Sequence, residues 1–151
     1  ELDSASGYGE LWRHLADARR RAADADLVLQ TRLPDIRWRG PHITDAMLHD
    51  LVPYVDTLLV LEAPAANLAP RLAPILQAPK ISLSTPRGRL RQPPDPRHRP
   101  DESLRLVLSS RLLLHPDYAP LLRPLVDDLR DLGLSTDQAL RRHLASESMA
   151  W

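Results

Sequence analysis

The run of residues 56–62 constrains the fold more than any other segment of the sequence. It reads Asp-Thr-Leu-Leu-Val-Leu-Glu, a continuous apolar stretch of strand length between two acidic residues. Runs of this kind are typical of strands that are buried on both faces of a sheet. We therefore expect residues 56–62 to form a central strand with helices on both sides of the sheet.

The segments before and after this run alternate between helical and strand periodicity. The predicted helices cover residues 11–22, 44–55, 67–76 and 117–132 and begin again at 135, and the other predicted strands cover 26–34, 80–84 and 104–109. The last helix should open with a capping box, because Ser135 and Gln138 have the required spacing. This alternation favours an α/β fold with a mostly parallel sheet of about four strands and helices on both faces.

The length of 151 residues is the usual size of one domain. We expect residues 1–151 to form a single three-layer α/β domain. Within it, residues 86–102 should form a basic, Pro-rich loop, and residues 135–151 a C-terminal helix and tail. A leucine-rich solenoid is an alternative, because the strand patterns near Leu58 and Ile81 lie about 23 residues apart. The irregular distances between the other strands argue against it.

The composition excludes several classes of protein. The 20 basic and 20 acidic residues cancel, so the overall charge does not indicate a nucleic-acid or membrane-surface protein. The absence of cysteine excludes disulfides, thiolate zinc sites and thiol nucleophiles. We find no apolar stretch of about 18 residues, so we expect no membrane partner. The chain begins at Glu1 instead of methionine, which is compatible with a removed organellar targeting peptide.

The sequence offers few catalytic candidates. Asp45 and His49 are spaced to share a helix face, but no third partner is implied, which favours a solvated helix surface. Ser109 and Ser110 follow a strand without the flanking glycines that expose a nucleophile. The five glycines do not form a phosphate-binding loop. We therefore expect no catalytic residue, no metal and no cofactor, and we expect that the protein is not an enzyme.

Two groups of arginines are candidates for binding phosphate. The larger group lies in the Pro-rich segment and contains Arg87, Arg89, Arg91, Arg97 and Arg99. Such a cluster can neutralise backbone phosphates without reading a base sequence, although a charged loop that merely keeps the protein soluble is the alternative. The smaller group, Arg37 and Arg39, flanks Trp38, which could add a stacking contact.

The order of the predicted elements resembles the globular core of the large-subunit ribosomal protein four family, over roughly residues 10–130. The segments that carry this resemblance are Leu27-Val-Leu29, residues 44–55, Asp56-Thr-Leu-Leu-Val-Leu61, Asn67-Leu68, Lys80-Ile-Ser-Leu83 and Leu106-Val-Leu-Ser109. The neutral charge and the lack of a basic loop before the first helix depart from that family. A divergent mitochondrial version could accommodate both departures.

This resemblance implies a structural constituent of the large ribosomal subunit, located in the mitochondrion. Its partners would be ribosomal RNA and other ribosomal proteins, with no small-molecule substrate, and the two arginine groups would contact the RNA. A protein-interaction scaffold of leucine-rich type is the first alternative function, and a small-molecule enzyme of doubly wound fold is the second. The enzyme alternative predicts a pocket at the carboxyl ends of the strands, near Glu62, Thr85 and Ser109.

Overall fold

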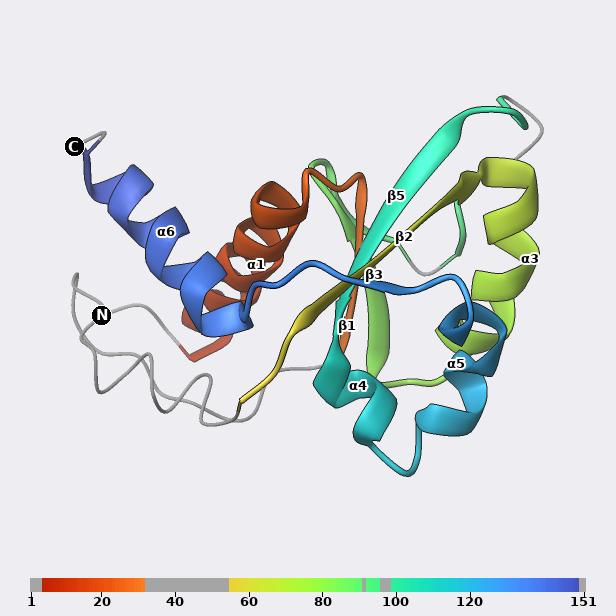
Figure 1. Ribbon diagram of the computed structural model, residues 1–151. Coiled ribbons are helices and arrows are strands. Elements are labelled where there is room, and N and C mark those ends of the chain that lie inside the picture. The colour runs from red at the N-terminus through yellow and green to blue at the C-terminus, as the bar shows by residue number, and fades with distance from the viewer. Residues whose placement is uncertain (1–3, 32–54, 91, 96–98, 150–151) are drawn as a thin grey trace.

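The computed structural model describes residues 4–31, 55–90, 92–95 and 99–149 (Figure 1). The elements in chain order are α1 (Ser4–Ala23), β1 (Leu27–Thr31), β2 (Leu58–Pro64), α3 (Ala65–Leu76), β3 (Ile81–Thr85), β4 (Gly88–Leu90), β5 (Ser103–Ser109), α4 (Ser110–Leu114), α5 (Ala119–Val126), β6 (Arg130–Asp131) and α6 (Thr136–Met149). The predicted helix over residues 44–55, with Asp45 and His49, lies outside the described residues. In the described part of the chain, no helix has the length and apolarity needed to cross a bilayer.

The six strands form one mixed sheet in the order β4-β3-β1-β5-β2-β6. β1 and β5 are parallel neighbours, and the other four neighbouring pairs are antiparallel. The predicted α/β class is confirmed, whereas the prediction of about four strands in a mostly parallel sheet is wrong. An apolar run reports that a strand is buried on both faces and carries no information about its direction.

The position of β2 also differs from the prediction. It pairs along its whole length with β5, from Leu58 opposite Ser109 to Pro64 opposite Ser103, but its other neighbour is the two-residue strand β6. β2 is therefore next to the edge of the sheet, and β1 and β5 occupy the centre. The same strand order excludes the leucine-rich solenoid, in which successive strands would be parallel neighbours.

Helices cover both faces of the sheet because successive strand residues point to opposite sides. Figure 1 shows α1 and α6 on one side and α3 and α5 on the other. Leu106 and Leu108 of β5 belong to the core that includes Leu72 of α3 and Leu122 of α5. Val107, between them, belongs to the second core, with residues near the end of α1 and in α6. The alternation in β5 thus joins the two helical layers.

Helix α3 persists although it contains two prolines. Pro70 and Pro74 each remove a backbone donor from the helix interior. The buried residues Leu68, Leu72 and Ile75 still hold its apolar face against the sheet, and such packing outweighs helix propensity. The helix begins at Ala65, earlier than predicted, and its first two N–H groups donate to the carbonyls of Glu102 and Pro100, at 2.9 and 3.0 Å.

The predicted basic loop of residues 86–102 contains the short strand β4. Residues 88–90 pair with β3 in a hairpin, and Gly88 adopts a φ of 130° at the turn. Three residues are too few for a period-2 pattern to be recognised among arginines and prolines.

The predicted helix over residues 117–132 is wrong in its second half. α5 ends at Val126, and the chain then forms β6 and turns at Gly133, whose φ is 74°. Leu129 packs with the α5 core, whereas Leu132 packs with the core on the opposite face of the sheet. Their three-residue spacing matches a helix by coincidence.

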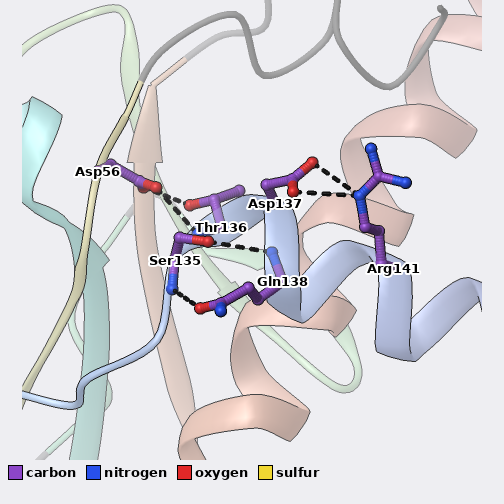
Figure 2. A network of polar contacts seen from close by, with 6 residues as sticks. All are labelled: Asp56, Ser135, Thr136, Asp137, Gln138 and Arg141. Atoms are coloured by element: carbon purple, nitrogen blue, oxygen red, sulfur yellow. Dashed lines mark hydrogen bonds and ion pairs between the residues drawn. The ribbon is translucent and has the colours of Figure 1, made fainter. Parts of the chain in front are cut away.

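The predicted capping box at the start of α6 is confirmed. The N–H of Ser135 donates to Oε1 of Gln138 at 3.0 Å, and the N–H of Gln138 donates to Oγ of Ser135 at 3.1 Å (Figure 2). These two bonds satisfy donors that would otherwise lack partners at the helix start.

Candidate functional site

A pocket of about 480 Å³ lies where β1 and β5 end. These strands are parallel neighbours, so their carboxyl ends meet at the same edge of the sheet. Lys80 joins them there because β3 runs antiparallel to β1. The described residues that line the pocket are Arg19, Leu29, Gln30, Thr31, Lys80, Ser109, Arg111, Leu112, Leu114, His115, Pro116 and Tyr118.

The charge of this lining is one-sided. Arg19, Lys80 and Arg111 are basic, and none of the described lining residues is acidic. Lys80 and Arg111 are exposed, whereas Arg19 is only 4% exposed. A concave site whose described lining residues include basic side chains and no acidic ones favours an anionic ligand.

Two rings lie in the loop between α4 and α5. The ring centroids of His115 and Tyr118 are 4.6 Å apart, at an interplanar angle of 35°. Nδ1 of His115 accepts the backbone N–H of Asp117 at 3.2 Å, which holds the imidazole in place. The rings, together with Leu112 and Leu114, give the basic pocket an aromatic and apolar part that suits a planar group.

A buried polar network connects Asp56 with the start of α6 (Figure 2). Oδ1 of Asp56 accepts the backbone N–H of Thr136 at 2.9 Å, and Oδ2 accepts the hydroxyl of Ser109 at 2.6 Å. The hydroxyl of Thr136 also donates to Oδ2. Asp56 is 8% exposed, so its charge is compensated by these donors and by its place at a helix N-terminus.

The network extends to the pocket wall through Arg19. Nε of Arg19 donates to Oγ1 of Thr136 at 3.2 Å, and one terminal nitrogen of its guanidinium donates to Oε1 of Gln30 at 3.1 Å. Arg19 was not among the predicted binding residues, although it follows Leu15 by four residues and so falls within the apolar stripe of its helix. A basic residue in a buried stripe is the signal that could have identified it.

A second cluster of polar side chains joins α1 to α6. Nδ1 of His14 lies 3.1 Å from Nε2 of His143, and a terminal nitrogen of Arg21 lies 3.4 Å from Nδ1 of His143. These contacts tie the two helices together away from the lining of the pocket. Among the described residues, no group of three or more His, Asp or Glu side chains is arranged to hold a metal ion.

The residues predicted for binding are not those that line the pocket. Arg87, Arg89 and Arg99 are exposed and lie outside it, and Arg99 is 4.0 Å from Glu102. The other predicted arginines, Arg37, Arg39, Arg91 and Arg97, lie outside the described residues. A binding role for the predicted arginines stays a prediction.

The strand-end positions proposed for an enzyme pocket divide between the two ends of the sheet. Ser109 lines the pocket, whereas Glu62 and Thr85 lie at the opposite end because β2 and β3 are antiparallel to β5 and β1. Ser109 and Ser110 have structural contacts: Oγ of Ser109 accepts the N–H of Arg111, and Oγ of Ser110 accepts that of Thr57. These serines therefore cap and join elements, as the absence of flanking glycines indicated.

The chain is similar to known proteins in structure, and this similarity concerns the fold. No protein-family model and no curated protein sequence matches the chain. A 5'-nucleotidase precursor from Thermus thermophilus is similar in structure, with a TM-score of 0.57 and 16% identity over 89% of this chain and 32% of that one. NAD nucleotidase from Haemophilus influenzae has a TM-score of 0.61 and 12% identity over 89% of this chain and 30% of that one. A putative 5'-nucleotidase from Staphylococcus aureus has a TM-score of 0.57 and 11% identity over 94% of this chain and 34% of that one.

The chain thus spans about a third of the length of these nucleotidases and shares the fold of that part. The predicted resemblance to the ribosomal protein four family is wrong, because the similar structures are nucleotidases. The expected ribosomal role and the expected RNA and ribosomal-protein partners are therefore wrong as well. The expectations of no enzyme and no small-molecule substrate are contradicted by the same structures. The ribosomal resemblance rested on the order and spacing of elements, which unrelated α/β proteins share and which do not specify strand direction. The mitochondrial location stays a prediction.

Proposed function

We propose that the chain binds a nucleotide in the pocket at the carboxyl ends of β1 and β5, as part of a nucleotide-hydrolysing enzyme. The observation that carries this proposal is the lining, which includes three basic side chains and, among its described residues, no acidic one. The likeness in fold to nucleotidases supports the same ligand class.

The basic residues would bind the phosphate. Lys80 and Arg111 are exposed side chains that can reach toward a ligand, whereas Arg19 is buried and held by Thr136 and Gln30. Arginine presents a planar fork that matches phosphate oxygens, and lysine acts as a compact charge. Two exposed cations and one buried cation held by hydrogen bonds together suit a phosphate group.

The ring pair would bind the base. His115 and Tyr118 lie in the same pocket as the cations, together with apolar Leu112 and Leu114. A base stacked on an aromatic side chain gains about 1–3 kcal/mol. The pocket volume of about 480 Å³ falls within the usual range for small-molecule sites.

The pocket residues can bind the nucleotide, which is the step before its hydrolysis. Hydrolysis also requires an activated water and a group that stabilises the leaving oxygen. We assign neither to a described residue, and we propose that bond cleavage is a property of the whole enzyme.

The proposal is tested by titrating the chain with AMP, adenosine and ribose 5-phosphate in a calorimeter. AMP should bind most tightly, because it alone combines a base with a phosphate. The affinity for AMP and for ribose 5-phosphate should fall as salt is added, whereas that for adenosine should change little. If AMP does not bind, or binds no better than adenosine, the pocket does not recognise the phosphate of a nucleotide.

A further inference from the structure

A carboxylate outside the pocket is connected to the pocket wall through hydroxyl groups. Asp56 is not a lining residue, whereas Arg19 is. Thr136 lies between them: its Oγ1 contacts Oδ2 of Asp56 and Nε of Arg19. The three residues come from the segment before β2, from α6 and from α1.

The number of protons on each group fixes which one donates in the hydrogen bonds that join Asp56, Thr136 and Arg19. A hydroxyl has one proton and can also accept, whereas an ionised carboxylate only accepts and an arginine only donates. The hydroxyl of Thr136 must therefore donate to Asp56 and accept from Arg19. Asp56 turns the lone pairs of Thr136 toward the guanidinium.

The same carboxylate orients a second hydroxyl at the pocket. Oγ of Ser109 donates to Asp56 at 2.6 Å and accepts the backbone N–H of Arg111 at 3.2 Å. Ser109 is the N-cap of α4, so this bond sets the start of the helix that carries Arg111. Asp56 thus acts on two of the three basic lining residues without touching the pocket.

We propose that Asp56 is a positioning residue that fixes the phosphate-binding side of the pocket through Thr136 and Ser109. This inference rests on the proposed function. Capping of α6 alone requires only the bond from the N–H of Thr136 to Oδ1, so the bond to Arg19 is an addition that the helix does not need. Acceptors at two nitrogens, from Thr136 and Gln30, hold the plane of the Arg19 guanidinium.

The charge of Asp56 and its orienting effect act in opposite directions on an anionic ligand. The negative charge weakens phosphate binding by its field, and the orientation of Arg19 strengthens it. Asp56→Asn changes both at once, so Thr136 is the better position for the test. Thr136→Val keeps the charge of Asp56 and the shape of the side chain but removes the hydroxyl, and Thr136→Ser keeps the hydroxyl.

The binding experiment compares the wild-type chain with these two variants, using AMP and adenosine as probes. Thr136→Val should weaken AMP binding about tenfold, because the bond between Arg19 and the phosphate is lost and such a charge-assisted hydrogen bond has about that effect. The affinity for adenosine should stay within about twofold of the wild-type value. Thr136→Ser should bind both probes like the wild type. Equal losses for AMP and adenosine in Thr136→Val, or no loss for either, would overturn the positioning role.

A second measurement does not depend on any ligand. Heteronuclear NMR of the arginine Nε–H groups reports how strongly the Arg19 proton is protected from exchange with water. We expect strong protection in the wild type and in Thr136→Ser, and rapid exchange in Thr136→Val. If wild-type protein fails to bind AMP, the proposed function fails, and the NMR result still decides whether the hydroxyl fixes Arg19. Unchanged protection in Thr136→Val would overturn the inference by itself.

Discussion

An arginine and a carboxylate lie near each other at both ends of the sheet, but their contacts and their burial differ. At the end opposite the pocket, the guanidinium of Arg105 lies 3.6 Å from Oε2 of Glu62, and both side chains are partly exposed. At the pocket end, Arg19 and Asp56 are both buried, and the hydroxyl of Thr136 lies between them.

The difference shows how burial changes what an ion pair requires. An exposed pair in direct contact is screened by water and contributes little to stability. A buried carboxylate is costly unless donors fill its lone pairs, which is why Asp56 has partners in Ser109 and Thr136. The exposed pair joins neighbouring strands at one end of the sheet. The buried network fixes the positions of its side chains at the other end.

The largest expected effect is on stability at the pocket end. Asp56→Ala should lower the free energy of unfolding by about 3 kcal/mol, because it leaves the buried donors of Ser109 and Thr136 without a partner. The matched change at the other end, Glu62→Ala, should cost less than about 1 kcal/mol. Urea denaturation measures both values, and similar losses for the two variants would remove the distinction between the ends.

The second effect is on ligand affinity. Lys80→Ala should weaken AMP binding about tenfold, because it removes an exposed cation from the pocket. Arg105→Ala removes an equal charge from the opposite end and should leave AMP binding unchanged. Calorimetric titration of both variants gives the comparison. If Arg105→Ala weakens binding as much as Lys80→Ala, the overall charge of the chain controls affinity and the pocket does not.

A third effect concerns the helix start that supports the buried network. Ser135→Ala removes the hydroxyl that accepts the N–H of Gln138, and it should lower the free energy of unfolding by about 1 kcal/mol. Thermal unfolding followed by circular dichroism measures this loss. Ser146→Ala, an exposed change later in the same helix, is the control and should have almost no effect. Equal losses for the two serines would mean that the capping box does not stabilise α6.

The smallest effect is a pH dependence at an exposed carboxylate beside the network. The hydroxyl of Thr57 and the backbone N–H of Gly133 donate to Asp131 and lower its pKa below the ordinary value of 3.8. A lowered folded-state pKa gives stability that is present above the unfolded pKa and is lost as the pH falls through the folded pKa. Asp131→Asn should therefore be less stable than wild type near neutral pH, and the gap should close as the pH falls below 3.8. Denaturation at a series of pH values measures the gap, and a gap that is constant with pH would exclude this contribution.

Much of the secondary structure could be predicted because it follows from local patterns. The strands near Leu29, Leu83 and Val107 and the capping box of Ser135 are all present close to their predicted positions. Strand direction could not be predicted, since burial on two faces is the same for parallel and antiparallel strands. The short strands β4 and β6 contain too few residues to show a period.

The site was less predictable because its residues are distant in sequence. Asp56 and Thr136 are separated by 80 positions, and no local pattern links a residue before a strand to the first turn of a later helix. Lys80 was assigned to a strand, and its place at the pocket depends on the antiparallel return of β3. Only Arg19 carried a local signal, as a charged residue in an apolar stripe.

The insertion of β5 between β1 and β2 has a consequence for how the chain reaches its folded state. The two partners of β2, β5 and β6, both follow it in the sequence. During synthesis the β1, β3 and β4 strands can pair early. Residues 58–64 have no strand to pair with on either edge until residues 103–109 have been synthesised. Pairing between distant segments slows folding and exposes unpaired strands to association with other chains. We therefore expect nascent chains that end before Ser103 to depend on chaperones and to lack the ligand pocket.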